Sequence, residues 1–166
     1  VVDTPSLFMR DVVVDEKSGT ASFVVMLGGP KGHVSNSTVT VDYATGNSSS
    51  NTSATAGSDY TAVSGTLTFA TGETVKTVVV DITDDAVAEG QERFNLNLSN
   101  AVGATLLDGQ GVALIGANDA VAVALPRISV SDMVASEADG YVDIVVSLSA
   151  PGQNAVAVNY TTANGT

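Results

Sequence analysis

Short runs in which apolar and polar residues alternate recur along this chain, and turn-forming residues bound each run. Alternation with a period of two places the apolar side chains on one face of a β-strand. The pattern is clearest in Thr74–Thr83 and in Arg93–Ser99, where Phe94, Leu96 and Leu98 share one face and are predicted to be core residues. No stretch offers apolar residues at helical spacing with caps at both ends. The pattern therefore favours an all-β fold.

Seven strands are predicted in the first part of the chain. They are Ser6–Val14, Thr20–Met26, Ser37–Ala44, Gly65–Phe69, Val75–Thr83, Glu92–Ser99 and Gly111–Ile115. Seven strands in about 115 residues is the count of an immunoglobulin-like domain. We therefore predict a seven-stranded, immunoglobulin-like antiparallel β-sandwich. The Gly-, Asn-, Ser- and Thr-rich stretch between Thr45 and Tyr60 is predicted to be a long, mobile loop.

A second copy of the opening strands begins near Pro126. The stretch Pro126–Glu137 parallels Pro5–Glu16 at a distance of about 120 residues, a period that indicates tandem sandwiches rather than a solenoid. The parallel continues from Gly19–Val25 to Gly140–Val146. We predict a complete sandwich at residues 1–119, a linker at residues 120–125 and a partial second copy of about three strands at residues 126–166.

The partial copy is expected to leave an inner face uncovered and a sheet edge unpaired. Either the chain is a piece of a longer polypeptide, or a neighbouring subunit supplies the missing strands by strand donation.

Composition excludes several classes of function. The formal net charge of −12 repels nucleic acid and anionic lipid surfaces, so neither nucleic-acid binding nor direct membrane insertion is expected. The chain has no cysteine, which excludes disulfides, thiolate metal sites and thiol nucleophiles. Its single histidine, His33, lies in a turn, and no phosphate-binding loop or nucleophile motif is present. We therefore expect that the protein is not an enzyme.

Acidic and amide side chains are expected to gather at one end of the sandwich, because alternate loops of an antiparallel sandwich emerge at the same end. The candidates are Glu16 in the first hairpin, Asp59 in the third loop, Asp84, Asp85, Glu89 and Glu92 in the fifth, and Asn118 and Asp119 after the last strand. Calcium (Ca2+) takes about 6–8 oxygen ligands, and a cation would relieve the repulsion among these carboxylates. The alternative is that Asp and Asn occupy these loops because they favour turn conformations.

Several motifs of the chain resemble the Calx-beta family, a domain of sodium-calcium exchangers and of many bacterial surface proteins. The motifs are Val41–Thr45, Ala54–Tyr60, Ser64–Phe69, Gly72–Thr74 and Ile82–Asp85, followed by Glu89, Glu92, Phe94 and Leu98–Asn100. The resemblance implies calcium ligation by Glu16, Asp59, Asp84, Asp85, Glu89 and Glu92, with a backbone carbonyl from Val87.

In the family an Asp-rich triplet commonly follows the last strand and supplies further ligands. Here the triplet reads Ala117–Asn118–Asp119, so its first carboxylate is missing. Fewer bound ions or a weaker affinity is the expectation.

These observations predict a calcium-rigidified structural or adhesion module of a large extracellular or cell-surface repeat protein, of bacterial origin. Its expected partners are neighbouring repeats of the same or an adjacent chain, with an extracellular protein or glycan as a further ligand. The alternatives are a filament subunit whose second sandwich is completed by a neighbouring chain, a calcium-dependent receptor, and a calcium sensor.

Overall fold

The computed structural model describes residues 4–28, 35–117, 126–130, 144–148 and 155–163. Most of these residues belong to strands or to the loops between them. The elements are β1 (Ser6–Met9), β2 (Val12–Val14), η1, a short 3-10 helix (Glu16–Ser18), β3 (Thr20–Gly28), β4 (Val39–Asn47), β5 (Ser64–Phe69), β6 (Val75–Asp81), β7 (Glu92–Val102), β8 (Thr105–Leu106), β9 (Gln110–Ile115), β10 (Ile128–Val130) and β11 (Val146–Leu148). No helix in these ranges is long and apolar enough to cross a membrane.

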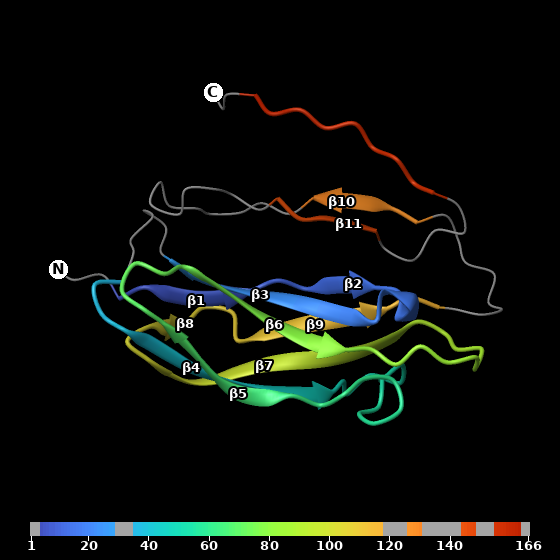
Figure 1. Ribbon diagram of the computed structural model, residues 1–166, viewed down its shortest axis with the longest axis horizontal. Helices are drawn as coiled ribbons and strands as arrows, with labels where there is room; N and C mark the ends of the chain where they lie inside the picture. Colours follow the sequence, from blue (N-terminus) through green and yellow to red (C-terminus); the bar gives the residue numbers. More distant parts are fainter. Residues whose placement is uncertain (1–3, 29–34, 118–125, 131–143, 149–154, 164–166) are drawn as a thin grey trace.

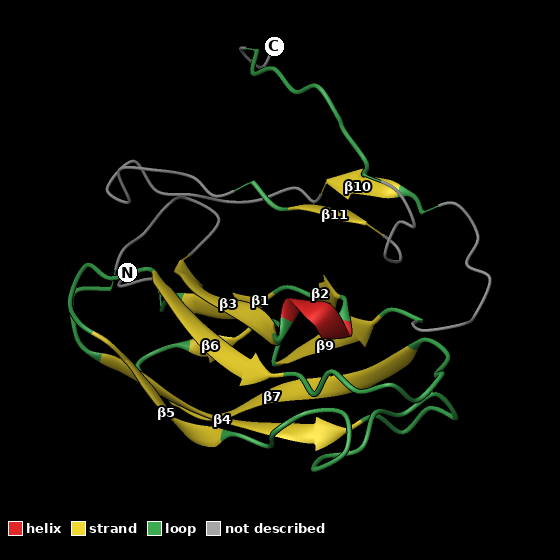
Figure 2. Ribbon diagram, turned by 45° about the vertical axis from the view of Figure 1, so that its right-hand side comes forward, coloured by secondary structure: helices red, strands yellow, loops and turns green. Residues whose placement is uncertain are grey.

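Two sheets face one another and form the predicted β-sandwich (Figure 1). The four-stranded sheet has the order β6-β3-β1-β8, and the five-stranded sheet has the order β2-β9-β7-β4-β5. The β10–β11 hairpin lies outside the layer that contains β1 and β3 (Figure 2). The expected all-β sandwich fold is confirmed.

The core between the sheets is built from the inward-facing residue of each alternating pair. Phe94, Leu96 and Leu98 are buried, as the alternation predicts. The ring of Phe94 is at the centre of an aromatic group: its centroid lies 5.8 Å from that of Phe23, edge to face, and 4.1 Å from that of Tyr60, stacked. Aromatic contacts of this kind stabilise a core beyond the area that they bury.

The first predicted strand, Ser6–Val14, is wrong as a single element. Its first half is β1, which pairs antiparallel with β3, and its second half is β2, which pairs parallel with β9 in the opposite sheet. The chain changes sheets between these halves, and the side chain of Asp11 accepts a hydrogen bond from the backbone N–H of Val112, 2.9 Å away. That bond satisfies a backbone donor of β9 at the point where the chain leaves one sheet and enters the other.

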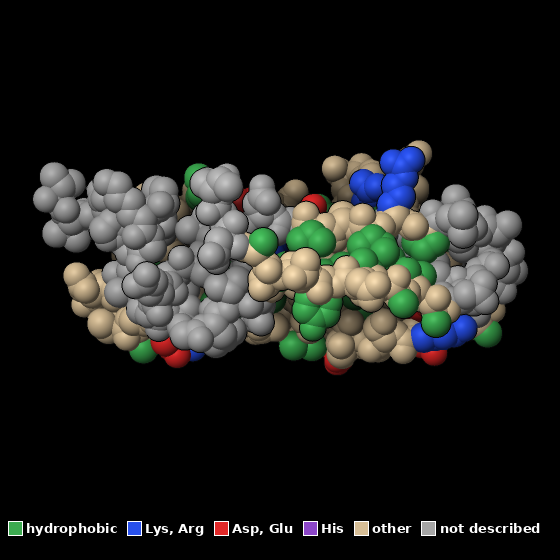
Figure 3. All heavy atoms as spheres, turned by 90° about the horizontal axis from the view of Figure 1, so that it is seen from above, with side chains coloured by type: hydrophobic (Ala, Val, Ile, Leu, Met, Phe, Trp, Pro, Cys, Tyr) green, Lys and Arg blue, Asp and Glu red, His purple; other side chains and the backbone are tan. Residues whose placement is uncertain are grey.

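Within the described residues, the second copy repeats only the β1–β3 pairing of the first, since residues 155–163, where a third strand was expected, contain no strand. Leu7 in β1 pairs with Leu27 in β3. The residues at the equivalent repeat positions, Ile128 and Leu148, pair in the antiparallel β10–β11 ladder. Leu7 is fully buried, whereas Ile128 is 41% exposed. Figure 3 shows hydrophobic side chains gathered on the face of the molecule that carries this hairpin. The predicted linker at residues 120–125 lies outside the described residues.

Candidate metal centre

Four segments that are distant in sequence meet at one end of the sandwich. The backbone N–H of Thr83, after β6, donates to the carbonyl of Asp59 at 3.0 Å, and the N–H of Ile82 donates to the carbonyl of Gly19 at 2.9 Å. The N–H of Arg93 in β7 donates to the carbonyl of Thr52, also at 2.9 Å. These bonds hold η1, the loop before β5, the end of β6 and the start of β7 together. We call this end the acidic pole, because it carries Glu16, Asp59, Asp85, Glu89 and Glu92.

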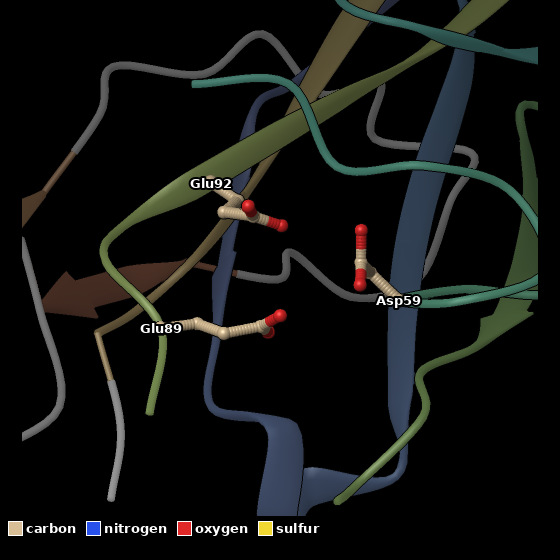
Figure 4. A group of neighbouring side chains, drawn as sticks. All are labelled: Asp59, Glu89 and Glu92. Atoms are coloured by element: carbon tan, nitrogen blue, oxygen red, sulfur yellow. The ribbon is translucent and has the colours of Figure 1, made fainter. Parts of the chain in front are cut away.

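Three carboxylates of the acidic pole converge most closely. One oxygen from each of Asp59, Glu89 and Glu92 lies within 4.8 Å of the other two. Figure 4 shows the carboxylates of Glu89 and Glu92 directed toward that of Asp59 across a common space. Oxygen ligands of calcium lie about 2.3–2.6 Å from the ion, so two ligands of one ion are at most about 5 Å apart. The observed spacing therefore fits an oxygen-ligated divalent cation.

Glu16 lies in the short helix η1, and capping interactions at both ends of this helix fix its position. Asp15 caps the N-terminus by accepting a hydrogen bond from the N–H of Lys17 at 3.0 Å. Gly19 ends the turn in the left-handed conformation, with φ of 68°. The turn leaves Glu16 only 3% exposed. Burial, followed by the charges of Glu89 and Asp85 and a hydrogen bond with Glu89, raises the pKa of Glu16 from 4.5 to about 7.

The glutamates that flank the start of β7 are perturbed in the same direction. Burial is the largest cause for Glu92, and the charges of Asp59 and Glu89 add to it, so that its pKa rises to about 7. Burial, then the charges of Asp59 and Asp85, also raises the pKa of Glu89. Each of these carboxyl groups is therefore costly to ionise beside the others. A bound divalent cation would offset the repulsion among these carboxylates.

The other predicted site residues occupy different positions. Asp85 is exposed, and its Oδ1 accepts a hydrogen bond from the N–H of Val87 at 2.7 Å. Val87 is itself 56% exposed on the loop that carries Asp84, which is also exposed. Asn118 and Asp119 lie outside the described residues. Ligation by these residues stays a prediction, whereas Asp59, Glu89 and Glu92 are brought together.

The loop before β5, which was predicted to be long and mobile, is anchored at several points. Ala54 is fully buried, and its N–H donates to the carbonyl of Arg93 at 2.8 Å. Tyr60 is buried against Phe94 at the other end of the loop. Asp59 lies between these two anchors and is 9% exposed, and its Oδ2 accepts a hydrogen bond from the backbone N–H of Thr55. The sequence signal for the anchors is the presence of a few apolar residues, Ala54 and Tyr60 among them, in an otherwise polar run.

Comparison with known proteins gives a consistent result. The family model of the Calx-beta domain matches residues 2–121 and, a second time, residues 117–166. Sodium/calcium exchanger 2 of Rattus norvegicus and of Homo sapiens are each 33% identical to the chain over 169 aligned residues, which cover 91% of this chain and 17% of the exchanger. Sodium/calcium exchanger 1 of Felis catus is 40% identical over 85 residues, which cover 51% of this chain and 8% of the exchanger. The chain thus corresponds to a small part of these relatives.

Solved structures resemble the fold at lower identity. The calcium binding domain CBD12 of CALX1.1 matches with a TM-score of 0.61 and 22% identity, over 76% of this chain and 50% of that one. The apo form of the Calx CBD1 domain matches with a TM-score of 0.58 and 23% identity, over 68% of this chain and 96% of that one. At these identities the likeness shows a shared fold.

Proposed function

The chain belongs to the Calx-beta domain family, and we propose that it is a non-enzymatic, calcium-binding structural module whose acidic pole holds the ion. The observation that carries this proposal is the convergence of Asp59, Glu89 and Glu92 within 4.8 Å. Glu16 lies beside them and interacts with Glu89. Carboxylate oxygens are ligands of calcium rather than of soft metals.

We further propose that calcium acts as a structural staple in an extracellular or cell-surface repeat protein. The acidic pole joins η1, the loop before β5 and the start of β7. An ion bound there would cross-link segments that otherwise repel one another and would stiffen the end of the sandwich. The partners in this proposal are neighbouring repeats, and the second family match at residues 117–166 supports it. An extracellular protein or glycan ligand is a further proposed partner.

A calcium sensor is the second candidate, because the similar full-length proteins are sodium/calcium exchangers. The two candidates differ in affinity. Extracellular calcium modules bind at roughly 10⁻⁴–10⁻³ M, whereas cytosolic sensors bind at roughly 10⁻⁷–10⁻⁵ M. A dissociation constant in the weaker range favours the structural module, and one in the tighter range favours the sensor.

Calorimetric titration of the chelator-treated chain with calcium tests the proposal. We expect saturable binding and a higher unfolding temperature in calcium, since a ligand at 100 times its dissociation constant stabilises the folded state by about 2.7 kcal/mol. Glu92→Gln should weaken binding by tenfold or more. Asp108→Asn is the matched control, because it makes the same charge change at an exposed position before β9, at the opposite end of the sandwich. Absence of both binding heat and a thermal shift would overturn calcium binding.

A filament of copies that complete each other's second sandwich is the other structural alternative. It is supported by apolar side chains that are exposed along the second copy, among them Val130, Val146 and Val158. Light scattering at micromolar concentration tests it, since a filament subunit should polymerise and a spacer module should not.

A further inference from the structure

Tyr60 is placed between the acidic pole and the core. It directly follows Asp59, and its ring stacks on that of Phe94 with a centroid distance of 4.1 Å and an interplanar angle of 13°. Phe94 in turn lies two residues after Glu92 on β7, so the side chains of Phe94 and Glu92 point to the same side of the strand. The stack of Tyr60 on Phe94 therefore joins the segment that carries Asp59 to the strand that carries Glu92.

A hydrogen bond fixes the other end of the Tyr60 ring. Its hydroxyl donates to Oδ1 of Asn47 at 2.7 Å, and the same oxygen accepts from the N–H of Ala56 at 3.2 Å. Asn47 is the last residue of β4 and lies opposite Phe94 in the β4–β7 ladder. Tyr60, Phe94 and Asn47 thus form a closed set of contacts on the five-stranded sheet.

Tyr60 is also tied to the opposite sheet. Its backbone forms an isolated antiparallel bridge with Ile82, just beyond the end of β6. The N–H of Thr61 donates to the carbonyl of Asp81 at 2.9 Å, and the N–H of Thr83 donates to the carbonyl of Asp59 at 3.0 Å. The segment that carries Asp59 is therefore held by its backbone to one sheet and by the Tyr60 side chain to the other.

We propose that Tyr60 and Asn47 are positioning residues that hold Asp59 at ligand distance from Glu89 and Glu92 before a cation binds. The proposal rests on the proposed calcium site. Without a cation the carboxylates repel one another, and the loop that carries Asp59 would relieve the repulsion by moving away from β7. Contacts that prevent this movement spare the ion the cost of ordering the loop, which raises affinity without adding a ligand.

Calcium titration of Tyr60→Phe and Asn47→Ala in the full chain tests the proposal. Tyr60→Phe keeps the stacked ring and removes only the hydroxyl, so the fold is retained. Loss of a hydrogen bond of this kind should weaken calcium binding about fivefold, with unchanged stoichiometry. Because both changes remove the same bond, the double variant should bind more tightly than the product of the two single effects predicts.

Tyr43→Phe is the matched control, since it also deletes a tyrosine hydroxyl, from a half-buried residue on β4, the strand that ends at Asn47. It should leave the dissociation constant within twofold of the wild-type value. Amide hydrogen exchange in chelator gives a second measurement: Tyr60→Phe should speed exchange at Thr61 and Thr83, and Tyr43→Phe should not.

The outcomes separate the two proposals. If the wild-type chain binds calcium and both Tyr60→Phe and Asn47→Ala bind it equally well, the positioning role is overturned while the calcium site stands. If a variant lowers the unfolding temperature equally with and without calcium and leaves the affinity unchanged, the contact is structural only, which also overturns the positioning role. If the wild-type chain binds no calcium, both proposals fall.

Discussion

Glu16→Gln should change the stability of the protein in opposite directions with and without calcium. Glu16 is 3% exposed, and its pKa is raised from 4.5 to about 7 by burial first, and then by the charges of Glu89 and Asp85. Gln has the shape of the protonated acid and cannot ionise. In the absence of calcium at pH 8, the substitution therefore removes a buried charge that the fold accommodates poorly.

The sign and the size follow from the pKa shift. Because the pKa of Glu16 is higher in the folded state, the folded state binds more protons between pH 4.5 and about pH 7. The stability contributed by protonated Glu16 is complete below pH 4.5 and is lost as the pH rises to about 7. One pKa unit corresponds to about 1.4 kcal/mol, so the shift of Glu16 sets an upper limit of about 3 kcal/mol. The same sign holds for Glu92, whose pKa is also about 7 in the folded state.

Urea unfolding at pH 4.5 and pH 8 measures the effect. In chelator, Glu16→Gln should be more stable than the wild type at pH 8, by one to about 3 kcal/mol, and nearly equal to it at pH 4.5. In saturating calcium at pH 8 the order should reverse if Glu16 is a ligand, as the family resemblance implies, because the variant would then bind the ion more weakly. Asp108→Asn, with the same charge change far from the acidic pole, should show neither effect.

Two results would refute this reasoning. One is a Glu16→Gln protein that is less stable than the wild type in chelator at pH 8. The other is a difference between the two proteins that does not change with pH, since that would mean that Glu16 does not titrate in the predicted window.

Three further predictions concern the scaffold. Phe94→Ala should lower the free energy of unfolding by about 3–5 kcal/mol, measured by urea unfolding in chelator. The substitution leaves a cavity at the centre of the core and removes both aromatic contacts. Asp11→Ala should cost about 1 kcal/mol by leaving the N–H of Val112 without its acceptor, and hydrogen exchange at that amide should accelerate. Gly19→Ala should cost about 1 kcal/mol in the same unfolding assay through backbone strain alone, since φ is 68° and no atom lies within 4 Å of the added methyl group. A larger loss for Gly19→Ala would mean that the turn also contributes packing.

Most of the strands could be predicted because each carries its own signal of alternating apolar residues. Alternation identifies Phe94 and its neighbours on β7 as core without reference to any other strand. The break after Met9 is marked only by the charged pair Arg10 and Asp11, which does not show that the two apolar halves belong to different sheets. Which sheet each half joins depends on the distant strands β3 and β9. The two residues of β8 are likewise a strand only because they pair with β1.

The acidic pole could be predicted in outline, because loop order alone places alternate loops at one end of a sandwich. Which acids converge depends on tertiary contacts. Asp59 lies near Glu89 and Glu92 in a loop that is anchored by Ala54 and Tyr60, and these anchors are side chains in a run whose composition indicates a loop.

The amino-acid sequence by itself therefore determined most of the strands, the repeat and the acidic character of the loops, since these are properties of local pattern and composition. Tertiary structure alone decided the burial of Glu16, the anchoring of Asp59 and the contact of Tyr60 with Asn47. Burial and distance arise between segments that are far apart in the chain, and the free energy of an ionised carboxylate depends on both.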